Sequence, residues 1–397
     1  MADPVEPVST SAPLDRNVYA VSVVSFFTDA SAEMIYPLLP VFLTTVLGAS
    51  AGFIGVIEGA AETTASLLKL AGGWWSDRVD RRKPLIVGGY ALASLVRPLV
   101  AVATSAGQVL AIRVADRVGK GIRGAPRDAL IADSVDEASR GRAFGLERAA
   151  DHAGAVVGPL VAFSVLTWGH ISLRPVFFLA AIPGLIALVV AAVYIREPAK
   201  HTTSAKPAAL PAIVPLGGRF WAVLVVITLF TLGNSTDAFL LLRAAQLGVP
   251  VALAPILWAM LHVVKATTST PGGALSDRIG RKPAVIAGWI IYAVVYLLFG
   301  RATQAWQAWA LFAVYGTYFG LAEGTEKAMI ADLVPGGRRG IAFGWYNLAI
   351  GIGALPASVV FGLLWDRYGS GTAFTFGAGM AALAVLALAV VPVTRKE

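Results

Sequence analysis

A short basic loop occurs twice in this sequence, and each copy lies between two long apolar runs. The first copy reads Gly73-Trp74-Trp75-Ser76-Asp77-Arg78-Val79-Asp80-Arg81-Arg82-Lys83-Pro84. The second copy reads Gly273-Ala274-Leu275-Ser276-Asp277-Arg278-Ile279-Gly280-Arg281-Lys282-Pro283. The glycine lets two helix ends approach, the aspartate can accept from N–H groups at a helix N-terminus, and the arginines remain among anionic headgroups. One copy alone would be an ordinary basic loop, but two copies indicate an internal duplication.

Two further segments repeat in the same order in each half of the chain. Ile131-Ala132-Asp133 returns as Ile330-Ala331-Asp332. The segment Arg-Gly-x-Ala-Phe-Gly begins at residue 140 and again at residue 339. A duplication of this kind predicts two six-helix bundles related by internal symmetry.

The composition is that of a membrane protein rather than a soluble one. Hydrophobic residues make up 57% of the 397 positions and charged residues only 14%, whereas soluble domains carry about 25% charged residues. The apolar runs have the length that a helix needs to cross about 30 Å of hydrocarbon. They predict an all-α polytopic membrane protein with about twelve transmembrane helices, over residues 18–46, 52–76, 84–104, 107–133, 141–167, 173–195, 219–246, 251–276, 283–301, 306–333, 340–366 and 371–392.

Basic residues are concentrated in the even-numbered loops and near the termini, which places both termini in the cytoplasm by the positive-inside rule. This asymmetry accounts for the net charge of +8 and leaves no support for a nucleic-acid partner. The predicted divisions are a disordered cytoplasmic tail, an N-terminal bundle, a proline-containing cytoplasmic linker, a C-terminal bundle and a short cytoplasmic tail. Their bounds are 1–16, 17–195, 196–218, 219–392 and 393–397.

Acidic residues occur within the first two predicted helices, far from either end. Asp29, Glu33 and Tyr36 fall within an arc of about 60° on the first helix, and Glu58 and Glu62 share one face of the second. Each charge buried at mid-membrane costs on the order of 3 kcal/mol, so these side chains are expected to face a cavity or a partner.

The fourth predicted helix carries the densest set of charges. Seven charged residues fall on an arc of about 140°; they are Arg113, Asp116, Arg117, Lys120, Arg123, Arg127 and Asp128. Facing lipid, they would together cost on the order of 20 kcal/mol, so this helix is expected to face inward. Each of these charges can alternatively be a structural counter-charge to the carboxylates of the first two helices.

These motifs identify the chain, by resemblance, as a member of the major facilitator superfamily. The two loops resemble the superfamily signature G-x-x-x-D-R-x-x-R-[RK], although the first copy has Asp80 and one extra basic residue. The stretch around Arg117 and Gly121 resembles the superfamily pattern in helix 4. The stretch Gly154-x-x-x-Gly158-Pro159 resembles one found in helix 5 of drug:proton antiporter-type exporters; as small residues at this spacing, it can equally be a helix-packing motif.

The resemblance implies a secondary active transporter that works by alternating access, and we expect proton-coupled efflux of a small polar or charged organic solute. A carboxylate in a low-dielectric site can load and release a proton as its surroundings change. The alternative is a proton-coupled uptake symporter for an organic anion or zwitterion. A membrane-embedded enzyme or receptor has little support, because the sequence contains no zinc-ligand spacing, nucleophile elbow or external domain. No phosphate-binding G-x-x-x-x-G-K-[ST] loop is present, so ATP is not expected to drive transport.

The candidate residues fall into three groups. Arginine guanidinium groups bind carboxylate or phosphate at two points, and the substrate-binding candidates are Arg117, Arg113, Arg123, Tyr36, Asn234, Asp237, Glu323 and Glu326. The proton-coupling candidates are Asp29, Glu33, Glu58 and Glu62. By the resemblance, the gating candidates are Gly73, Asp77, Arg78, Arg81, Asp133, Gly273, Asp277, Arg278 and Arg281.

The expected partners are a small-molecule substrate, protons and the lipid bilayer. We expect a monomer in a bacterial inner membrane, with no cofactor and no metal. The absence of cysteine excludes disulfides and thiol chemistry.

Overall fold

A computed structural model describes residues 13–76, 81–135, 140–169, 171–197, 216–334 and 339–392. Throughout these residues the regular structure is helical, with no strand. The predicted N-terminal tail, linker and C-terminal tail lie largely outside the described residues.

The first half of the chain crosses the molecule six times. Three crossings are broken into shorter helices, because a proline or a turn interrupts the hydrogen-bond ladder. The crossings are α1 (Arg16–Ile35) with η1 (Tyr36–Leu38) and α2 (Leu39–Thr45); α3 (Ala51–Ser76); α4 (Lys83–Val96) with η2 (Arg97–Val102); α5 (Ala106–Asp133); α6 (Arg140–Trp168); and α7 (Leu173–Leu179) with α8 (Ala181–Tyr194).

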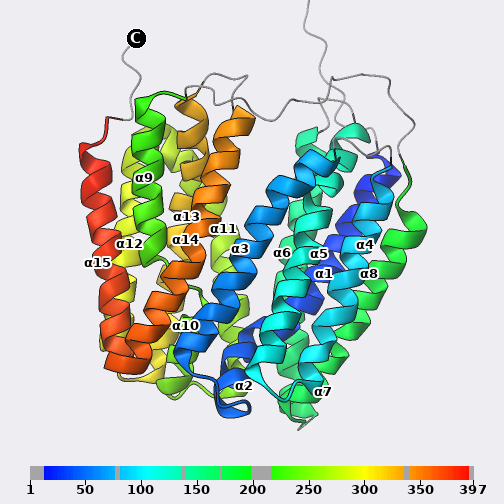
Figure 1. Cartoon of the computed structure of the whole chain (residues 1–397), viewed down its shortest axis with the longest axis horizontal. Coiled ribbons are helices and arrows are strands. Elements are labelled where there is room, and N and C mark those ends of the chain that lie inside the picture. The colour runs from blue at the N-terminus through cyan, green and yellow to red at the C-terminus, as the bar shows by residue number, and fades with distance from the viewer. Residues whose placement is uncertain are drawn as a thin grey trace, which may run out of the picture.

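The second half repeats this arrangement. Its crossings are α9 (Gly218–Gly233) with α10 (Ala238–Gln246); η4 (Val251–Leu253) with α11 (Ala254–Ile279); α12 (Arg281–Arg301); α13 (Ala305–Asp332); α14 (Arg339–Tyr368); and α15 (Ser370–Val390). Figure 1 shows the two halves as two bundles side by side, with α15 on one flank and α8 on the other. The predicted fold class is confirmed, and the predicted helix ends agree with the observed ones to within a few residues.

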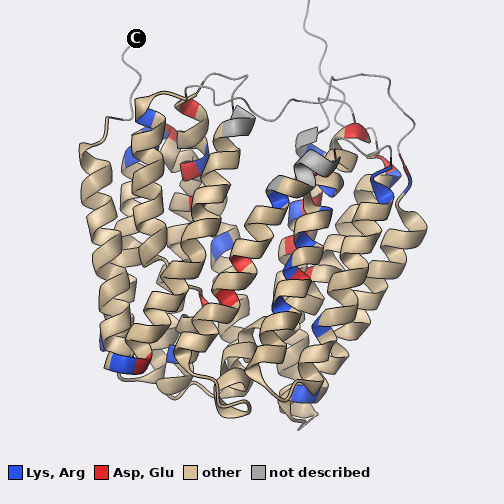
Figure 2. Ribbon diagram, viewed as in Figure 1, with Lys and Arg blue, Asp and Glu red and all other residues tan. Residues whose placement is uncertain are grey.

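The most polar helices lie where the two bundles face each other. Nine segments of the described chain are long and apolar enough to cross a membrane. The crossings outside this set are α3, α5 and α13, and each carries charges within its length. In Figure 2 the charges inside the span gather on central helices, and the outer flanks are almost free of them. This distribution agrees with the cost of exposing charge to hydrocarbon.

The first helix, α1, begins and the last helix, α15, ends on one side of the molecule, at the top of Figure 1. We call this the termini side and the opposite one the far side. The two duplicated loops lie on the termini side, because α3 and α11 end there and α4 and α12 begin there.

The closest contact between the bundles joins α3 to α14, and it runs from the far side past the middle of α3 to Ser66. A Cβ atom added at Gly55 would lie 2.2 Å from the backbone oxygen of Ser358. Nearer the termini side, the Thr63 hydroxyl donates to the backbone oxygen of Gly351 at 2.6 Å. At the far side, the Asp366 carboxylate of α14 accepts from the first N–H groups of α3, from Ala51 at 2.9 Å and from Gly52 at 2.7 Å. The α3 N-terminus is therefore capped by the other bundle.

The second contact between the bundles joins α6 to α11. The glycines of the helix-5 motif do not make it, since they pack inside the first bundle. A Cβ at Gly154 would lie 2.2 Å from the oxygen of Phe26, and a Cβ at Gly158 would lie 2.3 Å from that of Ala30. The motif therefore holds α6 against the backbone of α1.

Candidate functional site

The first and the seventh crossings, one in each bundle, are each interrupted within the span. The first breaks where α1 passes into η1 at Tyr36-Pro37, because Pro37 cannot donate to the ladder. The seventh breaks between Gly233 and Ala238. Tyrosines bond the groups freed at this second break: the Tyr292 hydroxyl donates to the oxygen of Gly233 at 3.1 Å. Interrupted helices at mid-membrane are the usual sites of substrate binding in transporters.

The two breaks meet at the boundary between the bundles. The hydroxyl oxygens of Tyr36 and Thr236 are 3.4 Å apart. The Tyr36 ring packs on Trp258 of α11, with centroids 4.9 Å apart. The Trp258 indole donates to the Glu33 carboxylate at 2.6 Å. Tyr36 and Glu33, predicted from one helix face, therefore both contact the second bundle.

A polar cavity of about 70 Å³ lies in the wall of the first bundle, next to this junction. It is lined by Asp29, Ala32, Glu33, Tyr36, Arg97, Arg113, Asp116, Arg117, Lys120 and Arg123. The inward-facing arc predicted for the fourth helix supplies half of this lining from α5. The three predicted arginines, Arg113, Arg117 and Arg123, all lie here.

Two of the cavity arginines are held in buried ion pairs. The Arg113 Nε and Nη2 atoms donate to the two carboxylate oxygens of Glu58 at 3.0 and 2.6 Å. Arg97 Nη2 donates to Asp116 at 2.8 Å, and Arg97 Nη1 donates to the backbone oxygen of Thr28 at 3.0 Å. The Arg113–Glu58 pair is bidentate, and it occupies the guanidinium face that would otherwise bind an oxyanion.

The other cations of the cavity are less completely bound. Arg117 Nη1 lies 3.9 Å from Asp116, and Arg117 Nε is buried with no hydrogen-bond partner among the described residues. Arg123 is only 6% exposed and stacks over the Tyr90 ring at 4.3 Å. Its Nη1 atom also has no hydrogen-bond partner in the described chain. Lys120 is exposed.

The four predicted proton-coupling carboxylates have different environments. Glu58 is paired with Arg113 and Glu33 accepts from Trp258. Glu62 is exposed, and Arg117 and Lys120 act on it electrostatically. Asp29 is half-buried on α1 and lines the cavity.

Sequence reasoning omitted Arg97 and Asp151 from the candidate residues. Arg97 lies inside the predicted third helix, and Asp151 lies inside the predicted fifth. A charged residue within a predicted span is itself the signal that could have found both.

The second bundle contributes fewer charges to the junction. Asp237, at the start of α10, accepts from the Tyr315 hydroxyl at 2.7 Å and lies 3.7 Å from Lys265 Nζ. The Lys265 ammonium lies 3.4 Å from the centre of the Phe319 ring, within cation–π range. Asn234, at the end of α9, is half-buried. Asp237 and Asn234 thus both lie at the break of the seventh crossing.

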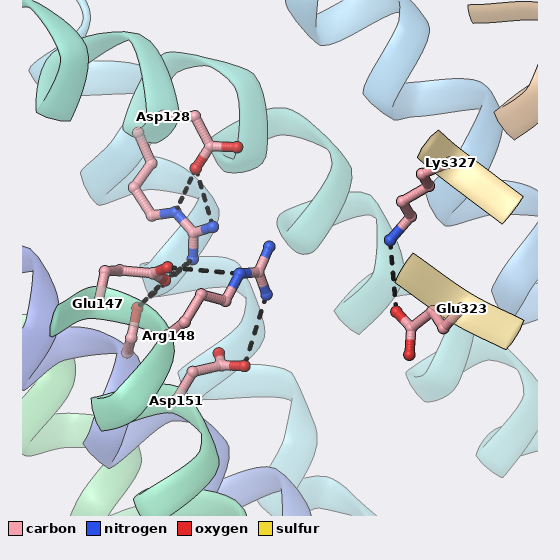
Figure 3. Close-up of polar contacts among 8 residues, drawn as sticks. Asp128, Glu147, Arg148, Asp151, Glu323 and Lys327 are labelled. Carbon is pink, nitrogen blue, oxygen red and sulfur yellow. Dashed lines mark hydrogen bonds and ion pairs between the residues drawn. The ribbon is translucent and has the colours of Figure 1, made fainter. Parts of the chain in front are cut away.

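The two glutamates predicted on the tenth helix do not lie in one environment. Glu326 is buried, and its two oxygens accept from Trp289 at 2.8 Å and Tyr346 at 3.1 Å. Glu323 is exposed and pairs with Lys327 one turn away at 3.3 Å. Figure 3 draws this pair together with the Glu147, Arg148 and Asp151 group of the first bundle.

The gating candidates that the structure describes lie at the termini side, where the two halves of the chain form equivalent ion pairs. Arg82 forms an ion pair with Asp133, and the equivalent Arg281 lies 3.5 Å from Asp332. Arg281 also pairs with Asp277 at 2.5 Å. The partner of Asp133 is thus Arg82, which was not among the predicted gating residues.

Within the described residues, Arg81 and Arg278 form no such pair. Arg81 and Arg278 are exposed, and Gly73 and Gly273 lie within α3 and α11. Asp77 and Arg78 lie outside the described residues.

Comparison with known proteins defines the class to which this fold and site belong. The family model of the Major Facilitator Superfamily matches residues 21–264 and 238–397, so the chain belongs to this family of membrane transporters. An uncharacterised MFS-type transporter of Methanocaldococcus jannaschii is 32% identical over 381 residues, which cover 94% of each chain.

A second relative and a solved structure extend the comparison. The class C tetracycline resistance protein of Escherichia coli is 30% identical over 292 residues, covering 69% of this chain and 70% of the relative. Among solved structures, a single-residue mutant of the nucleoside transporter NupG superposes with a TM-score of 0.80 at 13% identity. That superposition covers 94% of this chain and 99% of NupG, and at this identity it supports the fold alone.

Proposed function

We propose that this transporter exports a small zwitterionic organic solute in exchange for protons, by alternating access between the two bundles. The observation that carries the proposal is the set of unfilled donors in the wall of the first bundle. Arg117 Nε and Arg123 Nη1 are buried beside a polar cavity and have no acceptor in the described chain. Because a buried donor without an acceptor costs about 1–3 kcal/mol, an oxyanion of the solute arriving there would be stabilised.

The solute is proposed to carry a cationic group as well as an oxyanion. If the solute were purely anionic, protonation of the carboxylates near Arg117 would remove negative charge and strengthen the binding of the solute to Arg117. The proton and the solute would then bind to the transporter together, and the transporter could not exchange one for the other. A cationic group instead competes with protons for Asp29 and Glu62, and this competition is what an antiporter requires. Asp237 of the second bundle offers a further carboxylate at the junction.

The arrangement of the bundles agrees with a state that loads substrate from the termini side. The far side is held by the Asp366 cap and by the α3–α14 contact, which in the described residues reaches from there to Ser66 and Gly351. With the termini in the cytoplasm, as the positive-inside rule predicts, such a state takes up solute from the cytoplasm for export. Similarity to the class C tetracycline resistance protein supports the same direction.

The proposal is tested first by binding and then by gradient-driven flux. Purified protein is screened by thermal shift against tetracycline as a zwitterion, benzoate as an anion and tetraphenylphosphonium as a cation. The compound that stabilises most is then followed in proteoliposomes. An antiporter accumulates solute when the lumen is acidic, whereas a symporter accumulates it when the lumen is alkaline. Accumulation with an alkaline lumen, or no accumulation in either gradient, would overturn the proposal.

Arg117→Lys is expected to weaken solute binding by about 1–3 kcal/mol, roughly 5- to 150-fold in Kd. The reason is that an ammonium group cannot make the two-point contact of a guanidinium. Titration calorimetry with the solute found in the screen measures this change, and Arg301→Lys, at the exposed end of α12, is the matched control. If Arg117 is only a counter-charge to Asp116, the lysine variant will bind as tightly as wild type.

A further inference from the structure

The ammonium group of Lys265 lies among groups that recognise organic cations, beside the break of the seventh crossing. Lys265 Nζ is 3.7 Å from an oxygen of Asp237, at the start of α10. It is 3.4 Å from the centre of the Phe319 ring on α13 and 5.8 Å from the centre of the Trp258 ring on α11. One carboxylate and two aromatic rings therefore surround a single positive charge. Lys265, Phe319 and Trp258 were not among the predicted substrate-binding residues.

The lysine makes incomplete use of these groups. A hydrogen bond from an ammonium to a carboxylate is about 2.7–2.9 Å long, so the distance of 3.7 Å to Asp237 is too great for one. The Oδ1 atom of Asp237 accepts from Tyr315, but its Oδ2 atom, the one nearer Lys265, accepts no hydrogen bond within the described chain. Aromatic faces attract organic cations in general, including quaternary ammonium groups that have no proton to donate. The arrangement thus suits an organic ammonium ion at least as well as it suits lysine.

The groups of this cluster can be reached, and the lysine can leave it. The side chains of Lys265 and Asp237 are 19% and 18% exposed, so neither is sealed in the core. The lysine charge is carried on a flexible four-carbon stem, and Nζ donates no hydrogen bond to the residues that the structure describes. Withdrawal of Lys265 would therefore break an ion pair and a cation–π contact without unfolding a helix.

The cluster adjoins the part of the first bundle where an oxyanion is proposed to bind. The ring of Trp258 packs on Tyr36, and its indole donates to Glu33. Tyr36 and Glu33 line the same cavity as Arg117, whose Nε atom lacks an acceptor in the described chain. A solute with an oxyanion in this cavity could therefore extend across the junction toward Asp237.

We propose that Asp237, Phe319 and Trp258 form the subsite for the cationic group of the solute, a primary or methylated ammonium. Lys265 occupies this subsite until the solute displaces its ammonium group, so the lysine acts as an internal competitor. This proposal rests on the zwitterionic solute proposed above. If Lys265 were only a structural counter-charge to Asp237, its removal would create no site for a cation.

Lys265→Gln tests the proposal with tetramethylammonium as the probe. We expect the Kd of the probe to fall about 5- to 30-fold, which corresponds to about 1–2 kcal/mol of cation–π attraction that the lysine no longer takes up. Titration calorimetry at constant ionic strength measures the Kd. Lys327→Gln is the matched control, because it removes an exposed lysine of α13 that pairs with Glu323 one turn away, as Figure 3 shows. Its Kd should equal that of wild type.

Two further variants show whether the probe occupies the place of the lysine. Phe319→Leu or Asp237→Asn, each added to Lys265→Gln, should cancel the gain in affinity. The Asp237→Asn double variant also removes the unpaired charge, so it keeps the test valid if the other variants are unstable. The proposal is overturned if Lys265→Gln does not lower the Kd, or if the gain persists in either double variant, as it would if only long-range repulsion had been relieved.

The outcome for this subsite can be told apart from the outcome for the proposed function, because probe binding needs neither a solute nor a pH gradient. A gain in Lys265→Gln that both double variants cancel would support the subsite even if no zwitterion stabilises the wild-type protein, a result that refutes the proposed function. Conversely, a zwitterion that wild type exchanges for protons and that Lys265→Gln binds no more tightly would overturn the subsite and leave the function in place.

Discussion

Arg113→Ala is expected to destabilise the protein by about 3–5 kcal/mol, because it leaves the Glu58 carboxylate buried without its counter-charge. Glu58 is 7% exposed, and each of its two carboxylate oxygens accepts from Arg113. The pair joins α5 to α3, so its loss also weakens the wall that holds the cavity. Thermal unfolding in detergent, followed by tryptophan fluorescence, measures the loss.

A double variant separates the structural role of this pair from a functional one. Arg113→Met together with Glu58→Leu removes both charges, and replacing a buried pair by apolar groups is often neutral or stabilising. The double variant should therefore recover thermal stability. If it also transports normally, neither residue binds substrate or protons. If the single alanine variant unfolds at the wild-type temperature, the pair is not what stabilises this part of the bundle.

Gly55→Ala is expected to prevent closure of the far side. The added methyl carbon would lie 2.2 Å from the backbone oxygen of Ser358 and 2.7 Å from its carbonyl carbon. Neither is the end of a flexible side chain, so the two bundles must separate. Since over-packing costs about 1–3 kcal/mol, we expect the closed population to fall roughly 5- to 150-fold. Each bundle should stay folded, because this contact lies between the bundles.

The chain contains no cysteine, so an introduced cysteine is the only residue that a thiol label can modify. Labelling of such a cysteine can therefore measure the fall in the closed population. Thr45→Cys and Gln246→Cys place labels on α2 and α10, in a far-side cavity of about 420 Å³ between the bundles. Labelling by an impermeant maleimide should be faster in Gly55→Ala than in the parent. Gly88→Ala is the matched control, since a Cβ at Gly88 meets no atom within 4 Å. Equal labelling rates in all three proteins would show that the far side closes without this contact.

Asp366→Asn should also lower the population in which the far side is closed, but by less than Gly55→Ala does. A charged cap at a helix N-terminus contributes about 0.3–1 kcal/mol, and up to about 2 kcal/mol when partly buried. The amide keeps one acceptor oxygen for the N–H groups of Ala51 and Gly52 but loses the charge. The labelled cysteines measure this variant too, with Arg367→Gln as the neighbouring control. A labelling rate equal to that of the parent would mean that the Asp366 charge does not help to close the far side.

Much of the fold could be predicted because hydrocarbon imposes a length and a polarity on each crossing. The apolar run at 107–133 matches α5 at Ala106–Asp133, and the run at 141–167 matches α6 at Arg140–Trp168. Crossings broken by proline or glycine, such as the seventh, were predicted as single helices because hydropathy does not register a local break. The break at 234–237 thus emerged only in the structure.

The candidate site was predicted as helix faces rather than as pairs of residues. The polar arc of the fourth helix does face inward, with Arg113, Asp116 and Arg123 buried. Periodicity fixes the direction of a side chain around its own helix axis. It does not fix the height or rotation of the neighbouring helix, so Arg97 could not be matched to Asp116, nor Arg113 to Glu58.

The sequence by itself determined the duplication, the twelve crossings and the inward direction of the charged arcs, because each follows from the cost of placing polar groups in lipid. The tertiary structure decided which carboxylate meets which cation. It put Glu58 on Arg113, put Asp116 on Arg97 and left donors of Arg117 and Arg123 without acceptors among the described residues. The physical reason is that ion pairs and hydrogen bonds act over a few ångströms. Their partners are therefore set by how closely glycines such as Gly154 let two helix backbones approach.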